Sequence, residues 1–453
     1  MIYAESVRPP KRAGTRVSDT VPSVLPRSGE SWLIVCVFVL MAVSVWFSGN
    51  EGSTDLLRGS LQEQVVWGIA YFGAAIGLLR CRESLGGLIR SSLPVIAIIL
   101  LASLSTIWST DPSITLKRAI GLLGTSAFAY YIAGRFKLTE FVGILGVTCY
   151  GIAILSFLAI VLVPSIGVMH DSYAGAWRGI FIDKNVLGEF MALSLLTFGV
   201  VIFSKLWPRR LAVIGAALSL ALLVGSQSVS PLIICAVLLI AIALTVLYRR
   251  GSHGRLIALA LGVSLFLIGL SALAGGLDGQ FILNALGRND TLTGRTDLWP
   301  QVVQAISNRP WLGYGYSAFW LPNGDFTYFI SPNWTPNQSH NGYLEACLDV
   351  GVVGASTAVL AILVALRRGV ASLDRHLASC YAWPLLAVIY FLAVNLTESS
   401  IAKYNNFNWI IFVVAFLYAS QAAGKRQNEG RVRVSLGRPA MEAVRLAPDL
   451  VDG

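Results

Sequence analysis

Long runs of apolar residues recur along most of the chain and are separated by short polar segments. A run of roughly 20 apolar residues can cross a hydrocarbon core about 30 Å thick as an α-helix. The pattern therefore predicts about twelve transmembrane helices. Their approximate limits are 31–48, 64–80, 92–108, 117–134, 141–163, 186–204, 210–226, 231–248, 256–275, 343–366, 382–396 and 407–423.

Composition supports this prediction. The chain has 453 residues, of which 55% are hydrophobic and only 13% are charged. A soluble globular domain carries about 25% charged residues, so we predict an all-α integral membrane protein. The six cysteines fall mostly inside apolar runs, and no CxxC pair or Cys–His grouping suggests a metal site. We therefore expect neither a metal nor another cofactor.

Basic residues gather in the amino-terminal segment, in alternate short loops and in the carboxy-terminal segment. Positively charged loops stay in the cytoplasm, so both termini are predicted to be cytoplasmic. The formal net charge of +10 then reflects topology and does not indicate a nucleic acid partner. Residues 1–30 lack the apolar core of a signal peptide, and we interpret them as a disordered basic tail. Residues 424–453 form a second basic tail.

Two segments are too long to be simple connections, and the charge pattern places both outside. One is 164–185, and the other is a large loop at 276–341. The large loop divides the predicted helices into a group of nine (31–275) and a group of three (342–423). Because it is rich in aromatic residues, we expect it to contain short helices and to pack as a lid on the outer membrane face.

Within this loop, the run TGRTDLWPQVVQAISNRP predicts a short amphipathic helix. Thr296 is its expected N-cap. Leu298, Val302 and Ile306 recur on one face, which is typical of a helix on the membrane surface. The following WLGYGYSAFW has two interpretations, an interfacial aromatic belt or a platform on which sugars stack.

Sidedness separates the four histidines into two cytoplasmic and two outward ones, namely His253, His376, His170 and His340. His340 lies in NQSHNGYLE at the start of the tenth predicted helix, where Asn341 or Ser339 could be the N-cap. The positive end of the helix dipole favours a neutral imidazole, the form that a general base needs. The residues alone do not decide between a catalytic base and a histidine that bonds loop carbonyls.

Basic side chains on the outer face oppose the topology rule and need a reason. Arg178, Lys184, Arg288 and Arg295 are the candidates. Guanidinium groups bind phosphate oxygens in a bidentate manner, and lysine adds a point charge, so an anionic ligand is one explanation. Ion pairs within the loops, such as Arg178 with Asp183, are the other.

Two carboxylates, Glu189 and Glu345, lie about one turn inside predicted helices on the outer side. Ionisable groups within a membrane are candidates for function. Both are therefore candidates for a supporting role at the site, together with Asn341.

Two stretches resemble a known family. GRTDLWPQVVQAISNRPWLGYGYSAFW followed by SHNGYLEACLDVGVVG resembles the signature region of the O-antigen ligase and polymerase superfamily of bacterial membrane proteins. RGIFIDKNVLGEFMAL is similar to the family segment before a central helix, although HKN is the commoner form of its DKN. The repeated GR in GR…GRTDLW is most similar to the exopolysaccharide polymerase branch. The resemblance spans roughly residues 170–360 by motif.

This resemblance implies a multi-pass protein of the bacterial inner membrane that uses an undecaprenyl-diphosphate-linked oligosaccharide. The acceptor is a growing glycan, and no nucleotide or metal takes part. Proteins that regulate chain length and a flippase are further partners that the resemblance suggests, besides membrane lipid.

The resemblance also assigns roles to residues. It implies that His340 acts on the acceptor hydroxyl while Arg178 and Arg288 or Arg295 hold the diphosphate. Glu345 or Glu189 would orient the imidazole. Asp183 replaces the family histidine and is assigned no catalytic role.

Two alternatives stay open. One is the ligase reaction, in which a finished glycan moves to lipid A core. The other is a secondary transporter, for which about twelve helices would be usual. The chain shows no repeated half, and its polar groups lie near the outer edge rather than the bilayer midplane, so transport is disfavoured.

Overall fold

A computed structural model describes residues 28–43, 61–170, 173–258, 260–262, 295–321, 336–373 and 379–423. Over these residues the chain is mainly α-helical, and its β pairing is limited to an isolated bridge between Val168 and Trp177. The predicted all-α membrane fold is therefore confirmed. The predicted tails lie outside the described residues, apart from 28–30.

Thirteen labelled α-helices are described. They are α1 (Gly29–Val43), α2 (Leu61–Arg80), α3 (Arg82–Ser91), α4 (Leu93–Leu104), α5 (Pro112–Arg135), α6 (Leu138–Leu162), α7 (Pro164–Gly167), α8 (Lys184–Phe203), α9 (Arg209–Gly225), α10 (Val229–Tyr248), α13 (Arg295–Asn308), α14 (Gly342–Leu373) and α15 (Trp383–Val394). Two short 3₁₀ helices, η3 (Ser105–Ile107) and η5 (Ser379–Ala382), adjoin α4 and α15. A last helix follows at Phe407–Ala423.

Apart from α3, α7 and α13, these helices overlap predicted spans, and the span predicted at 256–275 lies mostly outside the described residues. By length and composition, four of the described helices can cross a membrane: α6, α8, α10 and α14. A fifth candidate is the pair formed by α2 and α3, which is bent by 103°. The count of twelve spans therefore stays a prediction.

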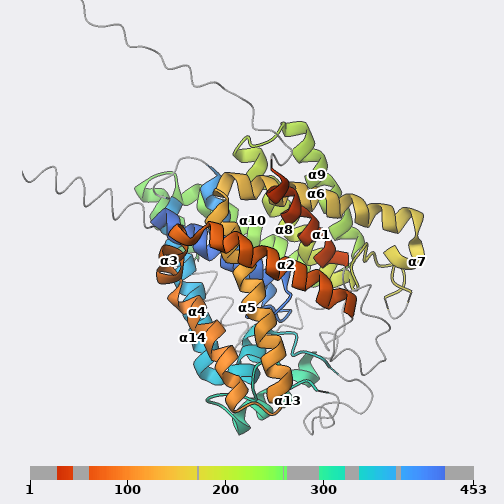
Figure 1. Cartoon of the computed structure of the whole chain (residues 1–453). Helices are drawn as coiled ribbons and strands as arrows, with labels where there is room; N and C mark the ends of the chain where they lie inside the picture. The colour runs from red at the N-terminus through yellow and green to blue at the C-terminus, as the bar shows by residue number, and fades with distance from the viewer. Residues whose placement is uncertain are drawn as a thin grey trace, which may run out of the picture.

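The core of the bundle lies around α8, which packs against α6, α9, α10 and α15 (Figure 1). The last helix is buried from Trp409 to Ser420, and Phe391 stacks on its Phe412 with ring centroids 4.4 Å apart. Large apolar side chains such as Phe72 on α2 and Leu239 on α10 are instead exposed. An apolar exterior is what contact with lipid requires.

The tenth predicted span is broken rather than continuous. Within α14, Val350 and Gly351 leave helical geometry, and Gly351 has φ 69° and ψ −173°. The segment 310–315 fills the break: Tyr314 N donates to Leu348 O (2.8 Å) and Val352 N donates to Pro310 O (2.8 Å). The loop thus satisfies the backbone groups that the break releases. As a result, the part of α14 before Val350 is a short separate helix.

Gly351→Ala is expected to lower the free energy of unfolding by about 1–3 kcal/mol, because this backbone conformation is accessible essentially to glycine alone. A Cβ there would also lie 2.1 Å from Trp311 O. Thermal unfolding in detergent measures the effect. Gly143→Ala in α6 is the matched control, since no atom lies within 4 Å of the added Cβ. Equal melting temperatures for the two variants would contradict the prediction.

The amphipathic helix of the large loop is present as α13, but its apolar face packs against the protein instead of facing lipid. Leu298 and Val302 are fully buried against the protein, in a cluster with Leu348 of α14. The apolar face therefore serves to dock the loop on α14 (Figure 1). The helix already includes Arg295, so Thr296 is inside it and is not its N-cap.

The aromatic residues after α13 differ in their exposure to solvent. Tyr314, Tyr316 and Phe319 are buried to 2% exposure or less, and their rings cannot offer a platform for sugars. Trp311 is 71% exposed, so its predicted place in an interfacial aromatic belt stays open. Burial decides between the two predicted roles because stacking on a sugar needs an accessible ring face.

Candidate active site

His340 lies directly before α14 in an unusual backbone conformation. Its φ is 52°, a left-handed value that is uncommon for a residue other than glycine. Of the two N-cap candidates in the sequence, Asn341 is the one used, because its Oδ1 accepts from the backbone N–H groups of Tyr343 (3.0 Å) and Leu344 (3.2 Å). Ser339 donates its hydroxyl to Asn341 O (2.8 Å). Local bonds therefore fix the turn that carries the histidine.

Glu345 supports the same turn from inside α14. One carboxylate oxygen accepts from Ser339 N (2.8 Å) and the other from Trp320 Nε1 (2.8 Å). Trp299 on α13 donates its Nε1 to Ser339 O (3.0 Å). The large loop and Glu345 thus hold the backbone next to His340.

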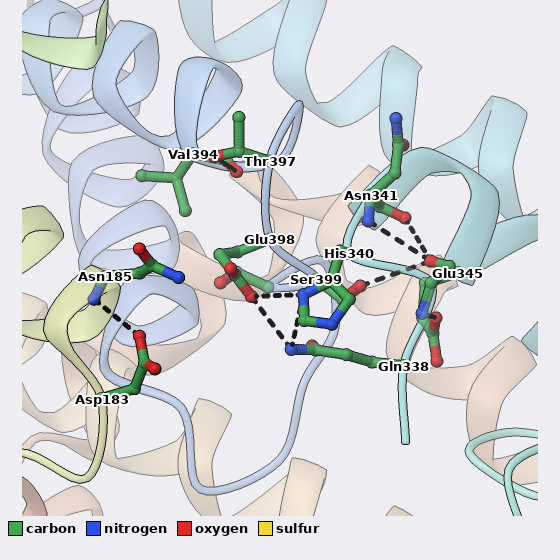
Figure 2. A network of polar contacts seen from close by, with 12 residues as sticks. Asp183, Asn185, Gln338, His340, Asn341, Glu345, Val394, Thr397, Glu398 and Ser399 are labelled. Atoms are coloured by element: carbon green, nitrogen blue, oxygen red, sulfur yellow. Dashed lines mark hydrogen bonds and ion pairs between the residues drawn. The ribbon is translucent and has the colours of Figure 1, made fainter. Parts of the chain in front are cut away.

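The carboxylate in contact with the imidazole is Glu398, which sequence reasoning missed. Glu398 Oε2 lies 3.3 Å from His340 Nδ1, and the two side chains are 15% and 24% exposed (Figure 2). Gln338 Nε2 donates to the same oxygen (2.9 Å), and Lys403 Nζ donates to Gln338 Oε1 (3.1 Å). Four side chains from two distant segments thus form one polar network.

This network determines which imidazole nitrogen can accept a proton. A carboxylate accepts from Nδ1–H, and this tautomer leaves the lone pair on Nε2. Gln338 Nε2 lies 3.4 Å from His340 Nδ1, but it donates its shorter hydrogen bond (2.9 Å) to Glu398 Oε2. A neutral histidine oriented by a carboxylate is the arrangement of a general base.

Glu398 and Lys403 lie between the last two predicted helices, in NLTESSIAKYNN. The alternation of charged loops predicts that this segment also lies outside. A carboxylate at the outer end of an apolar run was therefore a signal in the sequence. Nothing local in that segment points to His340, which lies 58 positions earlier.

Asp183 lies on the other side of Glu398 from the imidazole (Figure 2). Its Oδ1 accepts from Asn185 N (2.6 Å) and caps α8. Burial raises the pKa of the Asp183 carboxyl above its ordinary value. The Asn185 bond lowers this pKa, the nearby Glu398 raises it, and electrostatic interactions with Lys184 and His340 lower it.

Asp183→Asn is expected to stabilise the protein at pH 7, since asparagine also caps helices and carries no charge. With a raised folded pKa, the native state binds the proton more tightly than the unfolded state. Stability from Asp183 is therefore present below the ordinary value of 3.8 and is lost as pH rises through the folded pKa. Thermal unfolding should show a gain at pH 7 that shrinks towards pH 4. A difference independent of pH would contradict this.

Two of the four predicted diphosphate ligands have side chains within the described residues, and both have partners nearby in the sequence or structure. Arg178 donates from Nε to Ile166 O (2.8 Å) and from a terminal nitrogen to Ser165 O (3.2 Å), both in α7. Lys184 is buried, with Nζ 3.8 Å above the ring of Tyr173. Arg288 lies outside the described residues, and the side chain of Arg295 does too. Diphosphate binding by these four residues therefore stays a prediction.

Two further residues singled out by the sequence have other surroundings. Glu189 is buried within α8, and its backbone oxygen accepts from Tyr390 Oη (3.2 Å). His170 Nε2 lies 3.3 Å from Pro164 O in an exposed turn. Among the described residues, no group of three or more His, Cys, Asp and Glu side chains could hold a metal ion.

Comparison with known proteins adds two findings. Residues 214–359 match the family model described as O-Antigen ligase. The chain is also similar to the exopolysaccharide production protein ExoQ of Rhizobium meliloti (strain 1021), with 27% identity over 315 residues. That alignment covers 66% of this chain and 70% of the relative. The resemblance read from the sequence motifs is confirmed. His340 lies inside the matched family region, and Glu398 lies beyond it.

Proposed function

Because residues 214–359 match the O-antigen ligase family, we propose that this protein is a metal-independent glycosyltransferase of the bacterial inner membrane. It polymerises undecaprenyl-diphosphate-linked oligosaccharide repeat units into exopolysaccharide at the periplasmic face. The observation that carries the proposal is the contact between His340 and Glu398 at the outer start of α14. Similarity to a protein named for exopolysaccharide production supports polymerisation.

The proposed reaction is one displacement with inversion. The hydroxyl of the acceptor sugar attacks the anomeric carbon of the donor and loses its proton to His340 Nε2. The bond between that carbon and the diphosphate oxygen breaks, and the undecaprenyl diphosphate leaves with the bonding electrons. Glu398 stabilises the imidazolium that forms, in the way a carboxylate supports the histidine of a catalytic triad.

Cations are needed where negative charge grows on the leaving diphosphate. Arg178, Arg295, Arg288 and Lys184 are proposed for this role. Lys403 is a further candidate, since its Nζ is bonded to Gln338 beside the proposed base. Its side chain is exposed and can reach a ligand.

A second candidate function is ligation of the finished glycan to lipid A core. The description of the matching family model favours it. The chemistry at His340 would be unchanged, because only the molecule that supplies the hydroxyl differs. Undecaprenyl diphosphate would again be the leaving group.

Reconstitution of the purified protein in liposomes tests both functions. The vesicles contain an undecaprenyl-diphosphate-linked oligosaccharide, with or without lipid A core, and products are separated by size. A ladder of longer lipid-linked glycans without lipid A core supports the polymerase. Transfer only to lipid A core supports the ligase, and no glycosidic bond with either acceptor would reject both.

A further inference from the structure

The contact between His340 and Glu398 joins two segments that are far apart in the sequence. Other bonds must therefore fix the position of one segment relative to the other. His340 precedes α14, and Glu398 lies in the segment 395–406 between α15 and the last helix. Both side chains are polar, and each has several rotamers available. Their 3.3 Å contact therefore depends on how the two backbones are fixed.

Asn395 bonds to both segments. Its backbone oxygen accepts from Gly342 N (2.8 Å), two residues after His340. Its side-chain Oδ1 accepts from Ser400 N (2.9 Å) and Ile401 N (3.0 Å). The side chain of Asn395 therefore binds the backbone just after Glu398. The backbone oxygen of Asn395 binds the start of α14.

The Asn395 side chain is buried, and both its oxygen and its nitrogen are hydrogen-bonded. Its exposure is 0%, and its Nδ2 donates to Phe391 O (2.7 Å) in the last turn of α15. An amide in this position donates to one carbonyl and accepts from two N–H groups, which an aliphatic side chain of the same size cannot do. The geometry needs this residue type.

Gly342 makes the close approach possible. A Cβ at position 342 would lie 2.0 Å from Asn395 Oδ1. Any larger residue would push the start of α14 away from the Glu398 segment. A glycine and an asparagine thus meet where the two halves of the site are joined.

We propose that Asn395, seated against Gly342, is a positioning residue that sets the contact between Glu398 and the His340 imidazole. This proposal rests on the proposed function. Asn395 acts through Glu398 and is not itself a catalytic residue. Of the other links between the segments, the bond from Tyr343 Oη to Leu392 O (3.3 Å) joins the helices. The Ser339 and Ser399 hydroxyls (3.4 Å) and the bond from Gln338 Nε2 to Glu398 Oε2 (2.9 Å) are side-chain contacts beside the site itself.

The test is a double-mutant cycle in the reconstituted assay. Asn395→Ala should lower kcat at least tenfold while KM for the lipid-linked donor stays within twofold. The same change in a Glu398→Gln background should cost less than threefold, because the contact that Asn395 maintains is already lost. A purely structural role would lower activity by the same factor in both backgrounds, and that result would overturn the proposal.

Asn406→Ala is the matched control. Asn406 lies at the other end of the same segment, where its Oδ1 accepts from Trp409 N (3.0 Å) and begins the last helix. It should reduce thermal stability but keep kcat within twofold. Gly342→Ala should reproduce the kcat loss of Asn395→Ala. Normal kcat in both Asn395→Ala and Gly342→Ala would also refute the proposal.

The activity of the wild-type protein distinguishes a failure of the proposed function from a failure of the role proposed for Asn395. If wild type forms no glycosidic bond, the proposed function fails. If wild type is active and the variants show no loss, the proposed function stands and only the role of Asn395 is rejected.

Discussion

Replacing His340 with alanine is expected to reduce the rate of glycan transfer by about 10²–10⁴-fold, the usual contribution of a general base. The donor should still bind, because the proposed diphosphate ligands are other residues. The loss should therefore be in kcat, with KM for the lipid-linked donor little changed. Product formation in reconstituted liposomes, measured at several donor concentrations, gives both constants.

His170→Ala is the matched control for this variant. His170 is the second histidine that the charge pattern places outside, and it contacts Pro164 O in an exposed turn. It should keep activity within twofold of wild type. Wild-type activity in a well-expressed His340→Ala protein would show that His340 is not the base and that its bonds serve only the turn before α14.

Replacing Glu398 with glutamine is expected to cause the second-largest loss, about 10²-fold or more in kcat. Glutamine keeps the size of the side chain but removes the charge that stabilises an imidazolium, and its amide no longer selects the tautomer with the lone pair on Nε2. Because Glu398 is 15% exposed, little water is present to replace it. Initial rates at saturating donor measure the effect.

Asp111→Asn is the control for Glu398→Gln. Asp111 is another carboxylate on the predicted outer face, where its Oδ1 accepts from Ile114 N (3.0 Å) and caps α5. Asparagine keeps that cap, so activity should be unchanged. Full activity in Glu398→Gln would mean that the 3.3 Å contact does not support catalysis, whatever the result for His340.

The sequence predicted the outer turn of α14 well. Asn341 or Ser339 was expected to cap the helix, and Asn341 does. His340 was expected at its start, on the outer side. These features depend on bonds between residues two to four positions apart, which the order of residues expresses directly.

The partner of the histidine could not be predicted in the same way. Glu345 was the expected carboxylate because it lies one turn into the same helix, yet it bonds Ser339 N and Trp320 Nε1. Glu398 reaches His340 because α14 and α15 pack side by side. A contact between residues 58 positions apart depends on that packing and leaves no periodic pattern.

The sequence by itself therefore determined the fold class, the limits of most helices and the turn that presents His340. In a hydrocarbon core each backbone N–H must bond within its own helix, so apolar runs and helices coincide. The tertiary structure alone decided the break at Gly351, the docking of α13 on α14 and the meeting of Glu398 with His340. Each of these joins backbones or side chains from different helices, and the free energy of such contacts depends on shapes that form only when the helices pack.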